Sequence, residues 1–163
     1  MRIQTFGDSV LRQRAAPVDE VTPEIRAICE RMVEAMVRAD GVGLAAPQIG
    51  VSKRIIVLDV DGDFHILINP ELVATSGAVE ESSEGCLSVP GVAALVPRRT
   101  EATIRGTTLD GNTVEVTGEG LLARAIQHEM DHLDGRLFLD HLSPAKRQSL
   151  LKAYRRSQTD EEK

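Results

Sequence analysis

The chain has 163 residues, of which 42% are apolar and 27% charged, and its formal net charge is −6. These values exclude a disordered chain, and the length predicts one domain spanning residues 1–163. No apolar run approaches the roughly 18 residues of a membrane-spanning helix, and the acidic charge argues against broad binding to nucleic acid, DNA included. Two cysteines, Cys29 and Cys86, are too few for a disulfide framework, and the first residues lack an export signal. We therefore expect a cytoplasmic protein without a membrane partner.

The first predicted helix spans residues 23–38. Thr22 is suited to be its N-cap, and Pro23 to occupy its first position. Apolar residues recur at helical spacing and predict a buried stripe, formed by Ile25, Ile28, Cys29, Met32 and Met36. Because Cys29 falls in this stripe, we interpret it as a core residue and not as a reactive thiol.

Short strands are predicted in the middle of the chain. Residues 41–50 are expected to form a loop because of their Gly and Pro content, and residues 54–60 to form a strand. Asp61-Gly62 is a hairpin signal before a second strand over 64–69. Further short strands are expected, at 72–74, 94–96, 101–105 and 113–117.

Two more helices are predicted towards the end of the chain. One covers 119–133, with Gly135 just past its end, and a terminal basic helix covers about 144–157 and frays over 159–163. Strands clustered between helices predict an α+β fold, in which short antiparallel strands and hairpins pack around a central helix, with an N-terminal and a C-terminal helix.

The pentapeptide His-Glu-Met-Asp-His marks that central helix as metal-binding. His128 and His132 are four residues apart, so they project from one face and can hold one metal ion between them. Glu129 borders such a metal without having to ligate it, and can accept a proton from an activated water. Leu121, Ala125 and Leu133 turn this face partly towards the core, where a pair of imidazoles without a partner would be costly.

A third metal ligand is expected, since a catalytic zinc-like centre usually has three protein ligands and a water. The third histidine of a metzincin protease would fall at Phe138, and the glutamates after His132, Glu161 and Glu162, lie in a polar tail. Cys86, within Glu-Gly-Cys-Leu-Ser, offers a soft sulfur ligand. A bound metal would lower the pKa of its thiol and keep it as a thiolate. We therefore favour a Cys-His-His centre.

Two alternatives stay open at this point. One is an HExxH metalloprotease, which lacks its downstream third ligand here. The other is a metal-stabilised, non-catalytic binding module, which requires a fourth protein ligand, and no second cysteine lies near Cys86.

The segment Gly-Val-Gly-Leu-Ala-Ala-Pro-Gln at 41–48 is a third candidate element. No Lys follows its glycines, so it is not a phosphate-binding loop, and a tight turn is the ordinary explanation for the glycines. Gln48 offers an uncharged amide donor for a developing oxyanion.

The segments GVGLAAPQ, EGCLS and QHEMDH occur in this order, and together they resemble the three signature motifs of peptide deformylases. The resemblance covers nearly the whole chain. The resemblance implies that Cys86, His128 and His132 are the metal ligands, with water completing a tetrahedral site. It also implies that Glu129 is the general acid and base.

The same resemblance assigns the residues around the substrate. The amide of Gln48 and the backbone N–H of Leu87 would stabilise the oxyanion. Gly43 would let the substrate backbone lie close to the loop, and Leu121 and Ala125 would line the pocket for the methionine side chain.

The resemblance further implies an activity: removal of the formyl group from formylmethionine of newly synthesised polypeptides, with release of formate. The expected cofactor is one Fe²⁺ per chain, which Zn²⁺, Ni²⁺ or Co²⁺ can replace. Some deformylases dock on the ribosome through a basic C-terminal helix. Here the helix over 144–156 has five basic residues and no acidic one, for which a solvated face is the simpler explanation.

Overall fold

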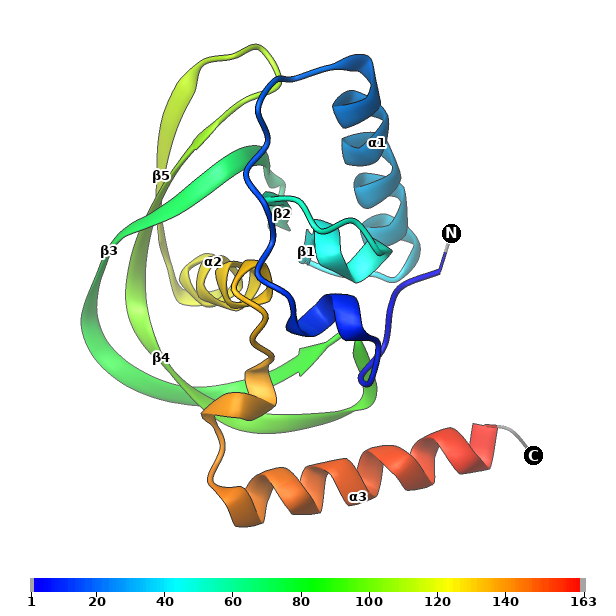
Figure 1. The fold of residues 1–163 in the computed structure, drawn as a ribbon. Helices are drawn as coiled ribbons and strands as arrows, with labels where there is room; N and C mark the ends of the chain where they lie inside the picture. Colours follow the sequence, from blue (N-terminus) through cyan, green and yellow to red (C-terminus); the bar gives the residue numbers. More distant parts are fainter. Residues whose placement is uncertain (1, 162–163) are drawn as a thin grey trace.

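The computed structural model describes residues 2–161. Over this range five antiparallel strands form one sheet in the order β1-β2-β3-β4-β5, and three α-helices pack on it (Figure 1). The strands are β1 (Gly43–Ala45), β2 (Ile55–Val60), β3 (Asp63–Cys86), β4 (Val89–Thr107) and β5 (Thr113–Glu119). The helices are α1 (Pro23–Arg38), α2 (Gly120–Leu133) and α3 (Pro144–Glu161), with 3-10 turns η1 (Ser9–Arg12), η2 (Ala46–Ile49) and η3 (Phe138–His141). The α+β prediction is confirmed.

Helix α1 begins and ends where the sequence predicts. The hydroxyl of Thr22 accepts a hydrogen bond from the N–H of Ile25 at 3.2 Å, and Pro23 is the first helical residue. All five residues of the predicted stripe are buried, and Cys29 is fully buried. Burial raises the pKa of the Cys29 thiol to about 11, so this thiol stays protonated and unreactive.

Strand β2 is buried on both faces, which explains its continuous apolar sequence. Ile56 and Leu58 pack into the core beneath α2, while Ile55 and Val57 pack into the core beneath α1. The predicted hairpin after this strand is confirmed, since Val60 pairs with Asp63 across the two-residue turn.

Strands β3 and β4 have 24 and 19 residues, so they are much longer than the short segments predicted from the sequence. The β3–β4 register shifts at four places, and these irregularities are bulges at which both strands continue. Gly77, with φ +78°, lies within one of them. Bulges bend a strand without ending it. The two strands therefore curve around α2 (Figure 1).

The segment expected as a loop over 41–50 contains two short regular elements. Residues 43–45 form β1, which pairs with β2, and η2 follows directly. The Gly and Pro content of this segment predicts a loop and gives no sign of β1. The strand forms because it pairs with β2.

Helices α2 and α3 agree with the prediction, except that α3 is longer. Gly135 follows α2 with φ +75°, and a Cβ there would lie 2.6 Å from the carbonyl oxygen of Arg12. Helix α3 continues to Glu161, so residues 159–161 are helical, and the rest of the predicted frayed tail, 162–163, lies outside the described residues. Within the described residues, no helix is long and apolar enough to cross a membrane.

Candidate metal centre

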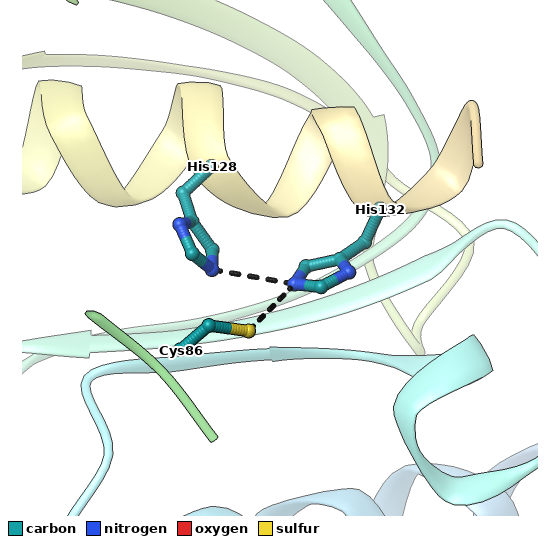
Figure 2. Close-up of side chains that lie close together, drawn as sticks. All are labelled: Cys86, His128 and His132. Carbon is teal, nitrogen blue, oxygen red and sulfur yellow. Dashed lines mark hydrogen bonds between the residues drawn. The ribbon is translucent and has the colours of Figure 1, made fainter. Parts of the chain in front are cut away.

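Cys86, His128 and His132 meet beside the inner face of α2 (Figure 2). Cys86 is the last residue of β3, and the two histidines lie one turn apart on α2. Nε2 of His132 lies 3.4 Å from Sγ of Cys86 and 3.3 Å from Nε2 of His128. The structure thus brings together the three ligands that the sequence predicts.

The spacing of these atoms fits a tetrahedral metal. Bonds of about 2.1 Å to nitrogen and about 2.3 Å to sulfur place tetrahedral ligand atoms about 3.4–3.6 Å apart. Nδ1 of His128 is engaged by Glu84, which leaves Nε2 facing the cluster. Two ring nitrogens and a sulfur converging at this separation are a donor set suited to a divalent cation.

The surroundings favour the thiolate form of Cys86. Burial alone would raise its pKa, but the neighbouring His132 and His128 outweigh burial and hold the pKa well below the usual thiol value. A thiolate is the form that binds metal.

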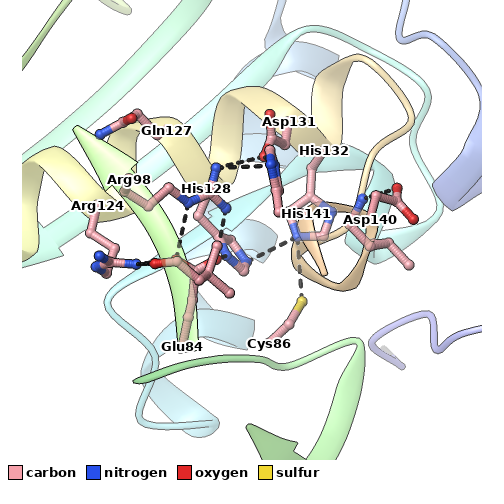
Figure 3. A network of polar contacts seen from close by, with 12 residues as sticks. Glu84, Cys86, Arg98, Arg124, Gln127, His128, Asp131, His132, Asp140 and His141 are labelled. Carbon is pink, nitrogen blue, oxygen red and sulfur yellow. Dashed lines mark hydrogen bonds and ion pairs between the residues drawn. The ribbon is translucent and has the colours of Figure 1, made fainter. Parts of the chain in front are cut away.

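Glu84 binds the Nδ1 side of the His128 ring, opposite the Nε2 that faces Cys86 and His132 (Figure 3). It is buried, and it accepts the Nδ1–H of His128 at 2.7 Å, two hydrogen bonds from Arg98 and one from Arg124 at 3.0 Å. Burial would raise the pKa of Glu84, but His128 and Arg98 lower it to about 2, so the residue is a carboxylate. A carboxylate behind a ligating histidine fixes the tautomer and orientation of its ring.

Glu84, Arg98, Asp131 and His141 surround the site, although the sequence predicts no role for them. Arg98 extends the network by donating to Asp131 at 2.7 Å, and His141 lies 2.8 Å from the same carboxylate. Glu84 could have been found from the requirement that a ligating imidazole has an acceptor for its second N–H. Arg98 and His141 come close only through the fold.

Glu129 is 4% exposed, and its Oε1 has no hydrogen-bond partner among the described residues. Burial raises the pKa of Glu129, and a carboxylate with a raised pKa is a better proton acceptor. A Cβ on Gly43 would lie 2.6 Å from Oε2 of Glu129, so Gly43 leaves room for this carboxylate.

The amide nitrogen of Gln48 faces the cluster formed by Cys86, His128 and His132. The Oε1 of Gln48 accepts the N–H of Ala45 at 2.9 Å, while Nε2 donates to the hydroxyl of Ser88 at 3.1 Å and lies 3.7 Å from Sγ of Cys86. Leu87 and Ser88 form the tight turn between β3 and β4. Ser88, to which the sequence analysis gave no role, is fully buried.

A cavity of about 630 Å³ opens onto these groups. Its lining includes every site residue that the sequence predicts except His132, namely Gly43, Gln48, Cys86, Leu87, Leu121, Ala125, His128 and Glu129. Leu121 is 51% exposed, whereas Ala125 is buried. The cavity therefore has an apolar wall leading from its mouth to the polar cluster.

The chain is similar to known proteins along most of its length. Residues 1–148 match the family model described as polypeptide deformylase. Among named relatives, the chain is 46% identical to the peptide deformylase of Hamiltonella defensa, with 100% of this chain and 96% of the relative covered. It is 51% identical to that of Halothermothrix orenii, with 86% and 92% covered.

Solved structures give the same result. The Legionella pneumophila peptide deformylase superposes with a TM-score of 0.89 at 43% identity, covering 97% of this chain and 96% of that one. The Synechococcus elongatus enzyme in complex with actinonin superposes with a TM-score of 0.90 at 40% identity, covering 94% and 85%. The chain therefore belongs to the polypeptide deformylase family, metal-dependent hydrolases that remove the formyl group from polypeptides.

Proposed function

We propose that the deformylation site consists of Cys86, His128 and His132 as metal ligands and Glu129 as general acid and base, acting within one domain over residues 1–163. The observation that carries this proposal is the meeting of three ligand atoms within 4.8 Å of one another, in a cavity that Glu129 also lines. The substrate is formylmethionine at the amino terminus of newly synthesised polypeptides, and the product is formate.

The metal would be one Fe²⁺ per chain, replaceable by Zn²⁺, Ni²⁺ or Co²⁺. When bound, it lowers the pKa of a water molecule and so supplies a nucleophile at neutral pH. Cys86 as a thiolate and His128 and His132 as neutral imidazoles would leave a bound divalent ion with a net charge of about +1, which would still polarise the formyl oxygen.

Glu129 would carry the proton through both halves of the reaction. Its carboxylate takes a proton from the attacking water as the oxygen bonds to the formyl carbon. It then gives that proton to the amine nitrogen as the C–N bond breaks, so that formate and a free amino terminus leave. The unpaired Oε1 and the raised pKa of Glu129 support this role.

Gln48 and Leu87 would stabilise the negative charge that develops on the formyl oxygen. The Gln48 amide is held at its oxygen by Ala45, so its nitrogen faces the cluster. Donors fixed before the reaction need no reorganisation when charge develops.

The methionine side chain would lie along Leu121 and Ala125, and the substrate backbone beside Gly43. All three line the cavity. An unbranched thioether side chain suits an apolar wall of this kind.

Docking on the ribosome in the cytoplasm is the proposed setting. The basic residues of α3 are Lys146, Arg147, Lys152, Arg155 and Arg156. The helix lies along the outside of the molecule (Figure 1). Cosedimentation with ribosomes, lost when Lys152, Arg155 and Arg156 are changed to Glu, would support docking, and unchanged cosedimentation would contradict it.

The proposed reaction is tested by formate release under anaerobic conditions. Protein supplied with Fe²⁺ should release formate from a formylmethionyl peptide and leave the acetylmethionyl peptide intact. Fe²⁺ protein should outperform Zn²⁺ protein and lose activity in air, since the ion and its thiolate are both oxidisable. Cleavage of internal peptide bonds without formate release would instead favour the metalloprotease alternative, and metal binding without turnover would favour the binding module.

A further inference from the structure

The segment Gln4–Phe6 touches both regions that carry the proposed oxyanion donors. The N–H of Gln4 donates to the carbonyl oxygen of Gln48 at 2.7 Å, and the N–H of Phe6 donates to the carbonyl oxygen of Ser88 at 2.8 Å. Ser88 follows Leu87, whose N–H is the second proposed donor. One short segment therefore bonds to the main chain beside each of the two donors.

A third hydrogen bond closes this arrangement. The amide nitrogen of Gln48 donates to the hydroxyl of Ser88 at 3.1 Å, and both residues are buried, with exposed fractions of 1% and 0%. The Gln4–Phe6 segment, η2 and the β3–β4 turn are thus joined pairwise by buried or part-buried polar contacts. Such contacts fix the separation of the groups they join, because breaking one leaves a buried polar atom without a partner.

The segment is itself anchored, so it can hold its neighbours. The ring of Phe6 meets Tyr154 of α3 edge to face, with centroids 6.1 Å apart. Phe6 also packs against the core cluster that contains Val89, directly after the turn. Between these residues, the N–H of Thr5 is engaged by Asp8 at 2.8 Å and does not reach the site.

We propose that the main chain of Gln4–Phe6 is a positioning element for deformylation: its two N–H groups set the separation between the amide of Gln48 and the N–H of Leu87. The inference rests on the oxyanion role proposed for those two donors. We call the two hydrogen bonds from Gln4 and Phe6 the clamp. Displacement of a catalytic group by about 1 Å can cost about 100-fold in rate, so loss of the clamp should slow the chemical step.

The test removes one N–H at a time. Proline has no N–H, so Gln4→Pro breaks the bond to Gln48, whereas Gln4→Ala keeps it. Thr5→Pro is the matched control, since it removes an N–H of the same segment that bonds to Asp8. Turnover is measured per bound metal, and kcat and KM are determined separately.

We expect Gln4→Pro to lower kcat by about 10-fold or more with KM and metal content unchanged, because only stabilisation of the transition state is lost. Gln4→Ala and Thr5→Pro should stay within about twofold of wild type in kcat, even where the melting temperature falls. An unchanged kcat per metal in Gln4→Pro, or an equal loss in Thr5→Pro, would overturn the proposal.

A double-mutant cycle separates this inference from the function on which it rests. If the clamp acts through Gln48, Gln4→Pro should cost little further in the Gln48→Ala background. The same factor in both backgrounds would overturn the clamp while leaving Gln48 as a donor. Full activity of Gln48→Ala alone would instead remove Gln48 from the oxyanion role, and the clamp with it.

If Gln4→Pro does not fold, the wild-type protein carries the test. A ligand that engages the donors should stabilise the clamp, because coupling between sites is reciprocal. Actinonin added to metal-loaded protein should slow amide hydrogen exchange at Gln4 and Phe6 and leave that of Thr5 unchanged. Unchanged exchange at Gln4 and Phe6 would overturn the proposal.

Discussion

The two halves of the site are built in different ways. The helix half consists of His128, Glu129 and His132, which lie within five consecutive residues of α2. The turn half consists of Gln48 and the segment 86–88, which meet only because η2 and the β3–β4 turn are folded together. The proposed metal ligands are divided between the halves, two on the helix and one at the turn.

This difference determines what each half depends on. The spacing of the helix half is fixed by the backbone hydrogen bonds of α2, which any stable helix provides. The spacing of the turn half depends on contacts between residues 40 positions apart in sequence, such as Gln48 with Ser88. Distant substitutions should therefore disturb the turn half more readily than the helix half.

The largest expected effect comes from removing the turn-half ligand. Cys86→Ala should abolish stable metal binding and formate release together, since two imidazoles on one helix turn are an incomplete site. Metal content and turnover are measured on the same preparation. Cys29→Ala is the control: this buried thiol lies in the core beneath α1, so its loss should affect stability and spare the metal. Stoichiometric metal in Cys86→Ala would remove Cys86 from the ligand set.

A smaller loss is expected where strand β1 touches the helix half. In Gly43→Ala the new Cβ would lie 2.6 Å from Oε2 of Glu129, so the carboxylate must move. We expect kcat to fall by about 100-fold with metal retained. In the Glu129→Gln background the same substitution should cost little more, and an additive loss there would show that Gly43 acts on the substrate instead.

The support behind His128 comes next in size. Glu84→Gln keeps the shape of the side chain but loses the charge that holds Nδ1–H of His128 and the guanidinium of Arg98. Such partners of a ligating histidine are typically worth about 10- to 100-fold in metal affinity or activity. Glu80→Gln, an exposed position on the same strand, is the matched control. Equal metal affinity in the two variants would show that Glu84 does not tune the site.

The smallest effect is expected outside both halves, at Asp140 of η3. Burial would raise its pKa, but the ion pair with Arg12 at 2.6 Å and the N–H of Leu137 lower it. A carboxyl with a lower pKa in the folded state stabilises the fold above its unfolded pKa, and this contribution is lost as pH falls. Asp140→Asn should lower the free energy of unfolding by at most about 1 kcal/mol near neutral pH. The difference from wild type should shrink in acid, and a difference that grows in acid would contradict the assignment.

The sequence predicted the helix half well because its information is local. Helical periodicity, Thr22 before α1 and Gly135 after α2 locate the helices, and the spacing of His128 and His132 places both on one face. Strand lengths were predicted poorly, because the bulges that let β3 and β4 continue depend on pairing between distant residues.

The turn half and the buried network were only partly visible in the sequence. Cys86 and Gln48 stood out for their chemistry and for the resemblance to a family. Ser88 and Arg98 have no local signal, because a serine or an arginine becomes important there only when folding buries it beside Gln48 or Glu84.

The central claim is that three residues hold the metal while Glu129 moves the proton, and Glu129→Gln tests it most directly. The amide is nearly isosteric and leaves all three ligands in place, but it cannot accept the proton of the attacking water. Metal stoichiometry and formate release are measured in one preparation. We predict wild-type metal content with kcat lowered by about 10²- to 10⁴-fold or more. Turnover within a few-fold of wild type, or loss of the metal, would contradict the account.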